Sequence, residues 1–282
     1  MITCNLMGGL GNQIFQIFTT LAYAIKSGHI YNFANIEILG GGSTTIRHTY
    51  WNSFFKELKQ YTVNTFPNFE IIRENNFEYN ILPLKTIKDN PNILLFGYFQ
   101  SYKYFEHEFK TICRLIKLQD MKSDLLNKIT YNSEYFRSTI CMHFRMGDYK
   151  KTPQFHPIMG YTYYESALQY ILNKSTCMDK VLYFCEDGDV IDVNEIINKL
   201  QLQFPNVLFV RCDNNLEDWE QMLVMSMCSH NIIANSSFSW WGAYFNENVN
   251  KIVCYPSVWF GPAANHNTID LFPDNWSKIQ CD

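Results

Sequence analysis

Three polar segments of this 282-residue chain combine residue types that suit the parts of a nucleotide. His143–Tyr149, HFRMGDY, contains an arginine whose guanidinium can donate two hydrogen bonds to a diphosphate. Cys185–Asp189, CEDGD, contains carboxylates that can accept hydrogen bonds from a base or a ribose. Asn235–Trp241, NSSFSWW, offers hydroxyls and backbone amides at the start of an expected helix, a combination that suits phosphate oxygens.

Each of these segments also has an ordinary structural interpretation. Arg145 and Asp148 could form an ion pair on a surface turn. A serine such as Ser236 or Ser237 is a common N-cap, and Asp189 could cap the helix that follows it. A functional interpretation is favoured only because the three segments are expected to lie together.

The elements around the segments predict that they share one edge of a sheet. From residue 139 onward the expected elements are strands at 139–144, 180–185, 207–210, 231–234 and 252–255, with helices at 163–173, 190–200, 219–228 and 240–245. This alternation is typical of an α/β fold with a parallel sheet and crossover helices, a Rossmann-like half. Each polar segment follows a strand, and ligands of open parallel sheets bind at the carboxyl ends of the strands.

A fourth candidate segment is MGGLGNQ at Met7–Gln13, between an expected strand and an expected helix. Gly9 allows a close approach of the backbone to a ligand, and Asn12 and Gln13 offer side-chain amides. The dinucleotide fingerprint G-x-G-x-x-G requires glycine or alanine where this chain has Ile14. A dehydrogenase is therefore disfavoured.

The rest of the N-terminal part carries weaker signals. We expect a strand at 2–7, a helix at 13–27, a strand at 93–99 and a helix at 102–118, with little regular structure between residues 36 and 90. The character of the sequence changes near residue 130. We therefore predict two domains, at residues 1–130 and 131–282.

Composition limits the class of protein. With 47% hydrophobic and 18% charged residues, the chain has the profile of a globular protein rather than a disordered one. A net charge of -4 argues against nucleic acid or an anionic membrane as the main partner. The nine cysteines include no C-x-x-C pair, which favours a reducing compartment without a zinc site. No apolar run is long enough to be a transmembrane segment, so we expect a cytoplasmic protein.

The four segments together resemble the α-1,2-fucosyltransferases of glycosyltransferase family 11. The resemblance rests on MGGLGNQIFQ at 7–16, HFRMGDY at 143–149, YFCED at 183–187 and NSSFSWWGAY at 235–244. It implies a GT-B-like fold, in which two Rossmann-like domains face a central cleft: an N-terminal domain on the acceptor side and a C-terminal domain that binds GDP-fucose. It also implies an inverting transfer of L-fucose from GDP-β-L-fucose to the 2-hydroxyl of a terminal sugar, commonly the galactose of a glycan acceptor.

The resemblance also implies roles for single residues. Arg145 stabilises the negative charge that grows on the β-phosphate. Asp148 either orients Arg145 or acts as the general base, and orientation is favoured because pairing with arginine lowers the pKa of a carboxylate and makes it a weaker base. The expected donor-binding residues, with Glu186 and Asp187 reading guanine, are Gly9, Asn12, Gln13, His143, Arg145, Glu186, Asp187, Ser236, Ser237 and Phe238.

Several alternatives stay open. The donor could be another GDP-sugar, because residues that would read fucose are not evident, or the chain could bind a nucleotide or glycan without catalysis. Asp187-Gly188-Asp189 also spells D-x-D, a metal motif of other glycosyltransferases. Because Asp189 can serve as an N-cap and Arg145 supplies positive charge, we predict neither a metal nor a cofactor beyond the donor substrate.

Overall fold

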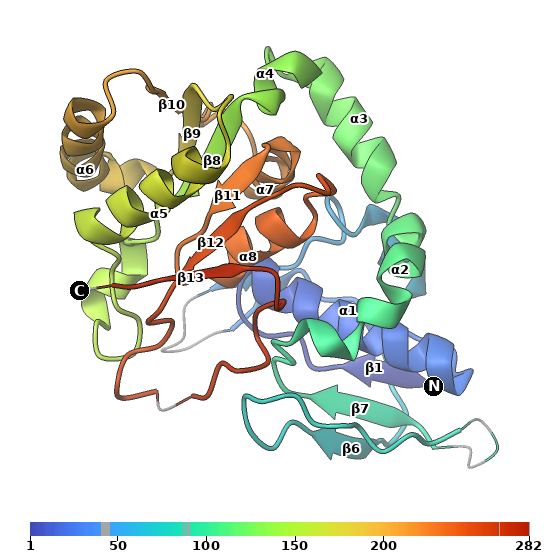
Figure 1. The fold of residues 1–282 in the computed structure, drawn as a ribbon. Helices are drawn as coiled ribbons and strands as arrows, with labels where there is room; N and C mark the ends of the chain where they lie inside the picture. The colour runs from blue at the N-terminus through green and yellow to red at the C-terminus, as the bar shows by residue number, and fades with distance from the viewer. Residues whose placement is uncertain (41–45, 87, 89–90, 265, 282) are drawn as a thin grey trace. The chain divides into compact units, whose positions relative to one another are not determined.

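The computed structural model describes residues 1–40, 46–86, 88, 91–264 and 266–281 (Figure 1). It divides into two compact units. Unit 1 comprises residues 1–121 and 266–273, and unit 2 comprises residues 122–265 and 274–282. The chain thus leaves unit 1 at residue 121 rather than at the predicted 130, and it returns to unit 1 once.

Side-chain contacts explain both differences from the predicted boundary. Helix α3 (Leu118–Lys128) is attached to unit 2 because Lys122 Nζ donates to the Phe245 carbonyl at 2.7 Å. The returning segment is attached to unit 1 because Asp270 accepts from the backbone N–H of Tyr79 at 3.1 Å and pairs with Lys103. These contacts join residues far apart in the sequence, so no local change of composition marks them.

Unit 1 contains a parallel sheet built around β1 (Ile2–Cys4). Strand β7 (Ile93–Phe96) pairs with β1, and β6 (Glu70–Arg73) pairs with β7. Ile2 also bridges to Tyr31, and the chain continues into β2 (Phe33–Ala34), which pairs in parallel with β5 (Thr62–Val63). Helix α1 (Leu10–Ser27) contacts β1 and is buried over most of its length because apolar residues occupy several of its faces.

Between residues 36 and 90, where little regular structure is expected, the described residues form only short elements. Besides β5 and β6, this stretch holds β3 (Ile38–Leu39), β4 (Arg47–His48) and the 3-10 helix η1 (Lys56–Tyr61). Most residues of these elements are exposed or half-buried, whereas Trp51, Phe54 and Phe55 between them are buried and in ring contact. Such elements leave no periodic pattern in the sequence. Part of the glycine stretch at 40–43 lies outside the described residues.

The remaining elements of unit 1 replace the single helix expected at 102–118. They are η3 (Tyr102–Tyr104), η4 (Glu106–Glu108) and α2 (Phe109–Leu115). The side chain of Ser101 starts this series by accepting from the N–H of Lys103 at 3.3 Å. Two short 3-10 helices, η3 and η4, therefore precede α2.

Unit 2 contains a wholly parallel sheet with the strand order β10-β9-β8-β11-β12-β13. Its strands are β8 (Thr139–His143), β9 (Lys180–Phe184), β10 (Leu208–Arg211), β11 (His230–Ile232), β12 (Val253–Pro256) and β13 (Ser277–Ile279). The order runs outward in one direction from β8 to β10 and in the other from β11 to β13. The boundary between β8 and β11 is therefore a topological switch point, where ligands of such sheets bind.

The helices of unit 2 follow the predicted alternation. They are α4 (Ser133–Arg137), η5 (Gly147–Lys151), α5 (Tyr161–Lys174), η6 (Asp187–Asp189), α6 (Val190–Gln203), α7 (Asp218–Met227) and α8 (Ser237–Tyr244). The α/β class and the Rossmann-like C-terminal half are confirmed. The facing of two domains across a cleft stays a prediction.

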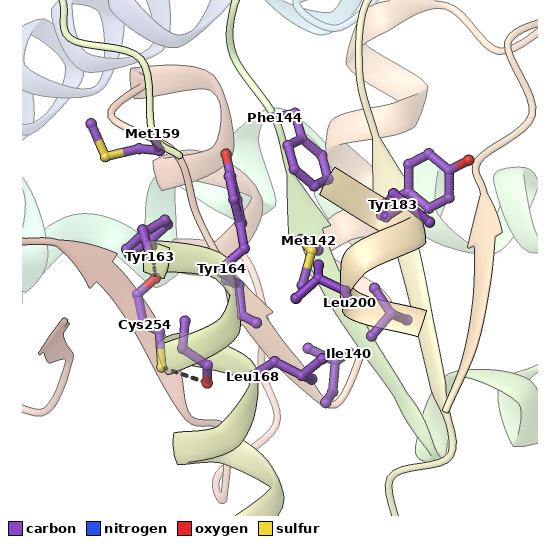
Figure 2. Packing of buried hydrophobic residues seen from close by; sticks show 14 of the residues in the cluster. Ile140, Met142, Phe144, Met159, Tyr163, Tyr164, Leu168, Tyr183, Leu200 and Cys254 are labelled. Carbon is purple, nitrogen blue, oxygen red and sulfur yellow. Dashed lines mark hydrogen bonds between the residues drawn. The ribbon is translucent and has the colours of Figure 1, made fainter. Parts of the chain in front are cut away.

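The core of unit 2 fixes the end of β8. Figure 2 shows Tyr164 and Leu168 of α5 beside Ile140 and Met142 of β8, in a cluster that α6 completes with Leu200. The buried Tyr164 hydroxyl donates to the carbonyl of His143 at 3.0 Å. The polar residues after His143 therefore start from a rigid point.

The contact between α7 and α8 depends on Gly242. A Cβ at this position would lie 2.8 Å from Met225 Cβ, closer than such atoms approach in real structures. We expect Gly242→Ala to lower the free energy of unfolding by about 1–3 kcal/mol, because an added methyl group overpacks this contact. Urea denaturation followed by circular dichroism measures the change.

Gly188→Ala is the matched control for that substitution. Nothing lies within 4 Å of a Cβ built at Gly188. Its effect should stay within about 0.5 kcal/mol. Equal losses for the two variants would contradict the steric explanation.

Candidate functional site

The guanidinium of Arg145 is the centre of the polar cluster after β8. It donates to Asp148 Oδ1 at 2.5 Å and to the Glu186 carboxylate, and it lies 5.1 Å from the centre of the Tyr149 ring. Its side chain is only 19% exposed. Burial acts to lower the pKa of Arg145, but Glu186 and Asp148 raise it above its usual value. The cation therefore stays charged in a largely buried place.

Asp189 holds the loop that carries Arg145. Its Oδ2 accepts from the backbone N–H of Gly147 at 2.6 Å, and its Oδ1 accepts from Lys150 Nζ at 2.7 Å. Lys150 also donates to Asp192 at 2.6 Å. Gly147 has φ +20° and has no room for a Cβ beside Glu186.

The predicted capping role of Asp189 is wrong. Asp189 occupies the N-cap position of α6, but its side chain makes no capping hydrogen bond within the described part of the chain. The carboxylate is only 4% exposed and is directed to the loop after β8 instead. An ion pair and a backbone N–H from that loop bind its two oxygens and hold the carboxylate away from the start of the helix.

His143 ends β8 as a neutral, buried ring. It is 6% exposed, and burial, with a smaller effect of Arg145, lowers its pKa to about 3. Its Nδ1 has no hydrogen-bond partner among the described residues. The ring centre lies 5.6 Å from that of Phe238 in α8. Buried polar atoms are nearly always paired, so an unpaired Nδ1 suits a place where a ligand supplies the partner.

The segment after β11 joins the same cluster. The Tyr149 hydroxyl donates to the Asn235 carbonyl at 3.0 Å, which links the segments after β8 and β11. Asn235 Nδ2 donates to the carbonyls of Pro157 and Trp259, at 2.9 and 3.1 Å, while its buried Oδ1 has no partner among the described residues.

Ser236 starts α8 as its N-cap, and its hydroxyl accepts from the Phe238 N–H at 3.3 Å. The ordinary interpretation of Ser236 is thus confirmed. Ser237 and Phe238, in the first turn, are half-buried. The first turn of α8 therefore brings its positive dipole end to the same strand edge as His143.

The two carboxylates predicted to read guanine have different partners. Glu186 joins the Arg145 cluster, whereas Asp187 accepts from Arg211 at 2.5 Å and from Asn214 at 3.4 Å. Hydrogen bonds from these two residues lower the pKa of Asp187. The three segments after β8, β9 and β11 therefore do lie together, with Asp187 directed toward β10.

The glycine segment lies in unit 1. Gly8 has φ +75°, which only glycine adopts freely, and Gly9 is the N-cap of α1, with open space around it. Gln13 is wholly buried, and its Nε2 donates to the carbonyls of Gly8 and His48, at 3.0 and 2.8 Å. Asn12 accepts from Gln100 at 2.9 Å. Gln13 thus fastens the turn, while ligand contacts of Gly9, Asn12 and Gln13 stay predictions.

A family model decides the class of protein. The model described as Glycosyl transferase family 11 matches residues 1–280. The chain belongs to glycosyl transferase family 11. It is therefore a glycosyltransferase, as the resemblance of the four segments predicts.

Three relatives extend this assignment at low identity. This family 11 chain is 27% identical to the O-antigen biosynthesis glycosyltransferase WbnK of Escherichia coli, over 99% of this chain and 100% of that protein. It is 25% identical to an alpha-1,2-colitosyltransferase of Escherichia coli, over 99% of each. It is 22% identical to a galactoside 2-alpha-L-fucosyltransferase of Caenorhabditis elegans, over 99% of this chain and 79% of that protein.

Two solved structures are distantly similar to the family 11 chain. The glycosyl transferase family 9 protein of Veillonella parvula is 9% identical, with a TM-score of 0.48 over 99% of this chain and 85% of its own. The ADP-heptose lps heptosyltransferase II of E. coli is 14% identical, with a TM-score of 0.37 over 57% of this chain and 43% of its own.

The D-x-D triplet of this family 11 chain is occupied by cations of the protein. Asp187 pairs with Arg211, and Asp189 pairs with Lys150. Across the described ranges, no three His, Cys, Asp or Glu side chains gather so that they could hold a metal ion. Among the same residues, no helix is both long and apolar enough to cross a membrane.

The composition of the cluster was only partly predictable. Tyr149 and Lys150 were not predicted as site residues, although Tyr149 lies inside the HFRMGDY motif. Asp189 and Asp192, one helical turn apart, form the pair that receives Lys150. Two acidic side chains three residues apart lie on the same side of a helix. Here they follow the end of β9, and this pattern could have indicated a basic partner from a neighbouring loop.

The loop after β8 should depend on Asp189. We expect Asp189→Ala to speed hydrogen exchange of the backbone amides at 147–151 by roughly tenfold, because it leaves the Gly147 N–H without its acceptor. Hydrogen exchange followed by mass spectrometry measures this. Asp192→Ala, which removes only the exposed partner of Lys150, should leave exchange of these amides nearly unchanged. If both variants exchange alike, Asp189 does not hold the loop.

Proposed function

We propose that this family 11 glycosyltransferase moves L-fucose from GDP-fucose to the 2-hydroxyl of a galactoside, with inversion and without a metal. The observation that carries the proposal is the largely buried cation Arg145, which follows β8 at the switch point between β8 and β11, two residues after the His143 ring that contacts Phe238 in the first turn of α8. Strand ends at such a point are where open parallel sheets bind nucleotides. The relative named as a galactoside 2-alpha-L-fucosyltransferase supports the choice of sugar and acceptor.

Unit 2 is proposed to bind the donor. The diphosphate would receive hydrogen bonds from Arg145 and from the first turn of α8, around Ser237 and Phe238, where the helix dipole also favours an anion. The unpaired Nδ1 of the neutral His143 can bond to a phosphate or ribose oxygen. Glu186 would accept from the guanine N1–H and its exocyclic amine.

The chemical step follows from the charge of Arg145. As the bond from the anomeric carbon to the β-phosphate oxygen breaks, negative charge grows on that phosphate. A cation already in place there stabilises the transition state more than the ground state, which raises the rate. Asp148 holds the guanidinium at 2.5 Å, so its proposed role is to orient Arg145.

A second donor is a specific alternative. The Escherichia coli relative named as an alpha-1,2-colitosyltransferase is 25% identical to this chain, compared with 22% for the galactoside 2-alpha-L-fucosyltransferase of Caenorhabditis elegans. A colitosyl donor would use the same nucleotide and phosphate contacts.

The proposal further places the protein in the cytoplasm. The cysteines support this location, since those in the described residues are all free thiols.

Transfer by the purified protein tests the proposal. GDP-fucose and a panel of galactosides, in buffer with EDTA, should yield an α-1,2-linked product by NMR. Arg145→Ala should lower kcat by about 10²–10³-fold, because the charge growing on phosphate loses its counter-charge.

Arg137→Ala is the matched control for Arg145→Ala. Arg137 forms an exposed ion pair with Glu134 at 2.9 Å, also within unit 2. Its removal should leave kcat within about twofold of wild type. A wild-type protein that transfers no sugar from GDP-fucose, or an Arg145→Ala variant as active as wild type, would refute the proposal.

Glu186 pairs with Arg145 in the free protein and is proposed to read guanine when the donor binds. Glu186→Gln should therefore act in opposite directions on two ligands. It should weaken GDP binding by roughly tenfold or more, since a hydrogen bond to a charged acceptor is lost. It should strengthen pyrophosphate binding up to about fivefold, since one partner of the cation is removed. Isothermal titration calorimetry measures both.

Glu195→Gln makes the same change of charge on the exposed face of α6 and should alter neither affinity. If Glu186→Gln weakens GDP and pyrophosphate equally, Glu186 only supports Arg145 and does not read the base.

A further inference from the structure

A row of aromatic rings extends from Arg145 along the carboxyl edge of the unit 2 sheet. The Tyr149 ring, whose centre lies 5.1 Å from the guanidinium carbon of Arg145, stacks on the ring of His156, with the centres 4.5 Å apart and an angle of 18° between the planes. The centre of the His156 ring lies 6.0 Å from that of Phe260, which follows β12. We call Tyr149, His156 and Phe260 the aromatic wall.

Hydrogen bonds hold the two segments that carry His156 and Phe260 together. The backbone N–H of Gly261, in the segment after β12, donates to the carbonyl of Phe155, in the segment after β8, at 2.8 Å. A Cβ on Gly261 would lie 2.2 Å from the Gln154 carbonyl oxygen, so this close approach requires glycine. The buried Asn235 amide donates to one carbonyl in each segment, at 2.9 and 3.1 Å. The aromatic wall is therefore built on a fixed backbone.

The order of the strands determines which part of the donor can meet the aromatic wall. The relevant strands lie in the order β9-β8-β11-β12, all within unit 2. Glu186, after β9, is the proposed reader of guanine, and Arg145, after β8, is proposed to bind the diphosphate. The Tyr149 hydroxyl reaches the Asn235 carbonyl after β11, and Phe260 follows β12. Because base and sugar lie at opposite ends of a nucleotide-sugar diphosphate, the sugar is expected on the side of the aromatic wall.

The rings of the aromatic wall suit an apolar group of that sugar. His156 and Phe260 are half-buried, so part of each remains accessible. Both proposed donor sugars, L-fucose and colitose, carry a methyl group at C6, where galactose carries a hydroxymethyl group. A methyl group is stabilised by contact with an aromatic ring. A hydroxyl in the same place would lose water and find no hydrogen-bond partner on a phenyl ring, which costs free energy.

We propose that the aromatic wall binds the C6 methyl group of a 6-deoxy sugar donor, and that Phe260 selects against a hydroxyl at C6. This inference rests on the proposed fucosyl transfer and adds the sugar-binding part of the donor site. Tyr149 has a positioning role, because its contacts with Arg145 and His156 relate the place of the sugar to that of the phosphate. Phe260 takes no part in bond breaking, so its loss should change the choice of donor.

Transfer from two donors that differ only at C6 tests the proposal. GDP-L-galactose is GDP-L-fucose with an added hydroxyl on C6. The wild-type kcat/KM should favour GDP-L-fucose by about 10–100-fold, the range in which an apolar pocket rejects an added hydroxyl. Phe260→Ala should reduce this ratio at least about fivefold. Its affinity for GDP, which carries no sugar beyond the diphosphate, should stay within twofold of wild type by isothermal titration calorimetry.

Leu202→Ala is the matched control for the loss of an apolar side chain. Leu202 is 84% exposed near the end of α6, a helix that runs away from the carboxyl edge of the sheet. This variant should keep both the donor ratio and the GDP affinity of wild type.

Phe260→Ala also removes a contact with His156, so Phe260→Tyr provides a second measurement. It keeps the ring and adds a polar atom, and it should lower the same ratio at least about threefold. Two Phe260 variants with the wild-type ratio, or a wild-type protein that uses both donors equally well, overturn the role of the aromatic wall while fucosyl transfer stands. A wild-type protein inactive with GDP-fucose overturns both proposals.

Discussion

The cost of burying the charge on Arg145 shapes the whole edge of the unit 2 sheet. A cation removed from water is stable only if it is paired and hydrogen-bonded. Asp148 and Glu186 supply the opposite charges, and Asp189 fixes the loop on which the arginine stands. Each partner comes from the loop after β8 or the loop after β9, so the ion pairs also tie neighbouring strands together at their carboxyl ends. Asp148 and Glu186 neutralise Arg145 in the free protein. An anionic ligand could therefore take the place of one of these carboxylates without leaving the cation unpaired.

The sheet places that cation at its topological switch point. Strand order reverses between β8 and β11, and ligands of open parallel sheets bind at the strand ends of such a point. Tyr164 fixes the carbonyl of His143, and Tyr149 connects the loop after β8 to Asn235. The close contact of α7 with α8 at Gly242 holds the helix whose first turn faces the same edge. Packing far from the cluster thus determines how precisely its polar atoms are placed.

The sequence alone predicts the alternating elements of unit 2 and the convergence of their polar segments, because long buried strands and amphipathic helices leave periodic signals. It does not predict β13 or the return of residues 266–273 to unit 1, which depends on the distant partners of Asp270. Asp189 shows how a correct local rule can fail: its position fits an N-cap, but a loop 40 residues away in the chain occupies both oxygens. Glu74 stands alone in a polar stretch, so only the fold reveals that two backbone N–H groups surround it.

Three carboxylates of this chain show how surroundings assign different chemistry to one functional group. Asp148 and Glu186 pair with a guanidinium and hold a cation in place. Glu74 is held by neutral N–H donors in a half-buried place, where burial outweighs those bonds and raises its pKa.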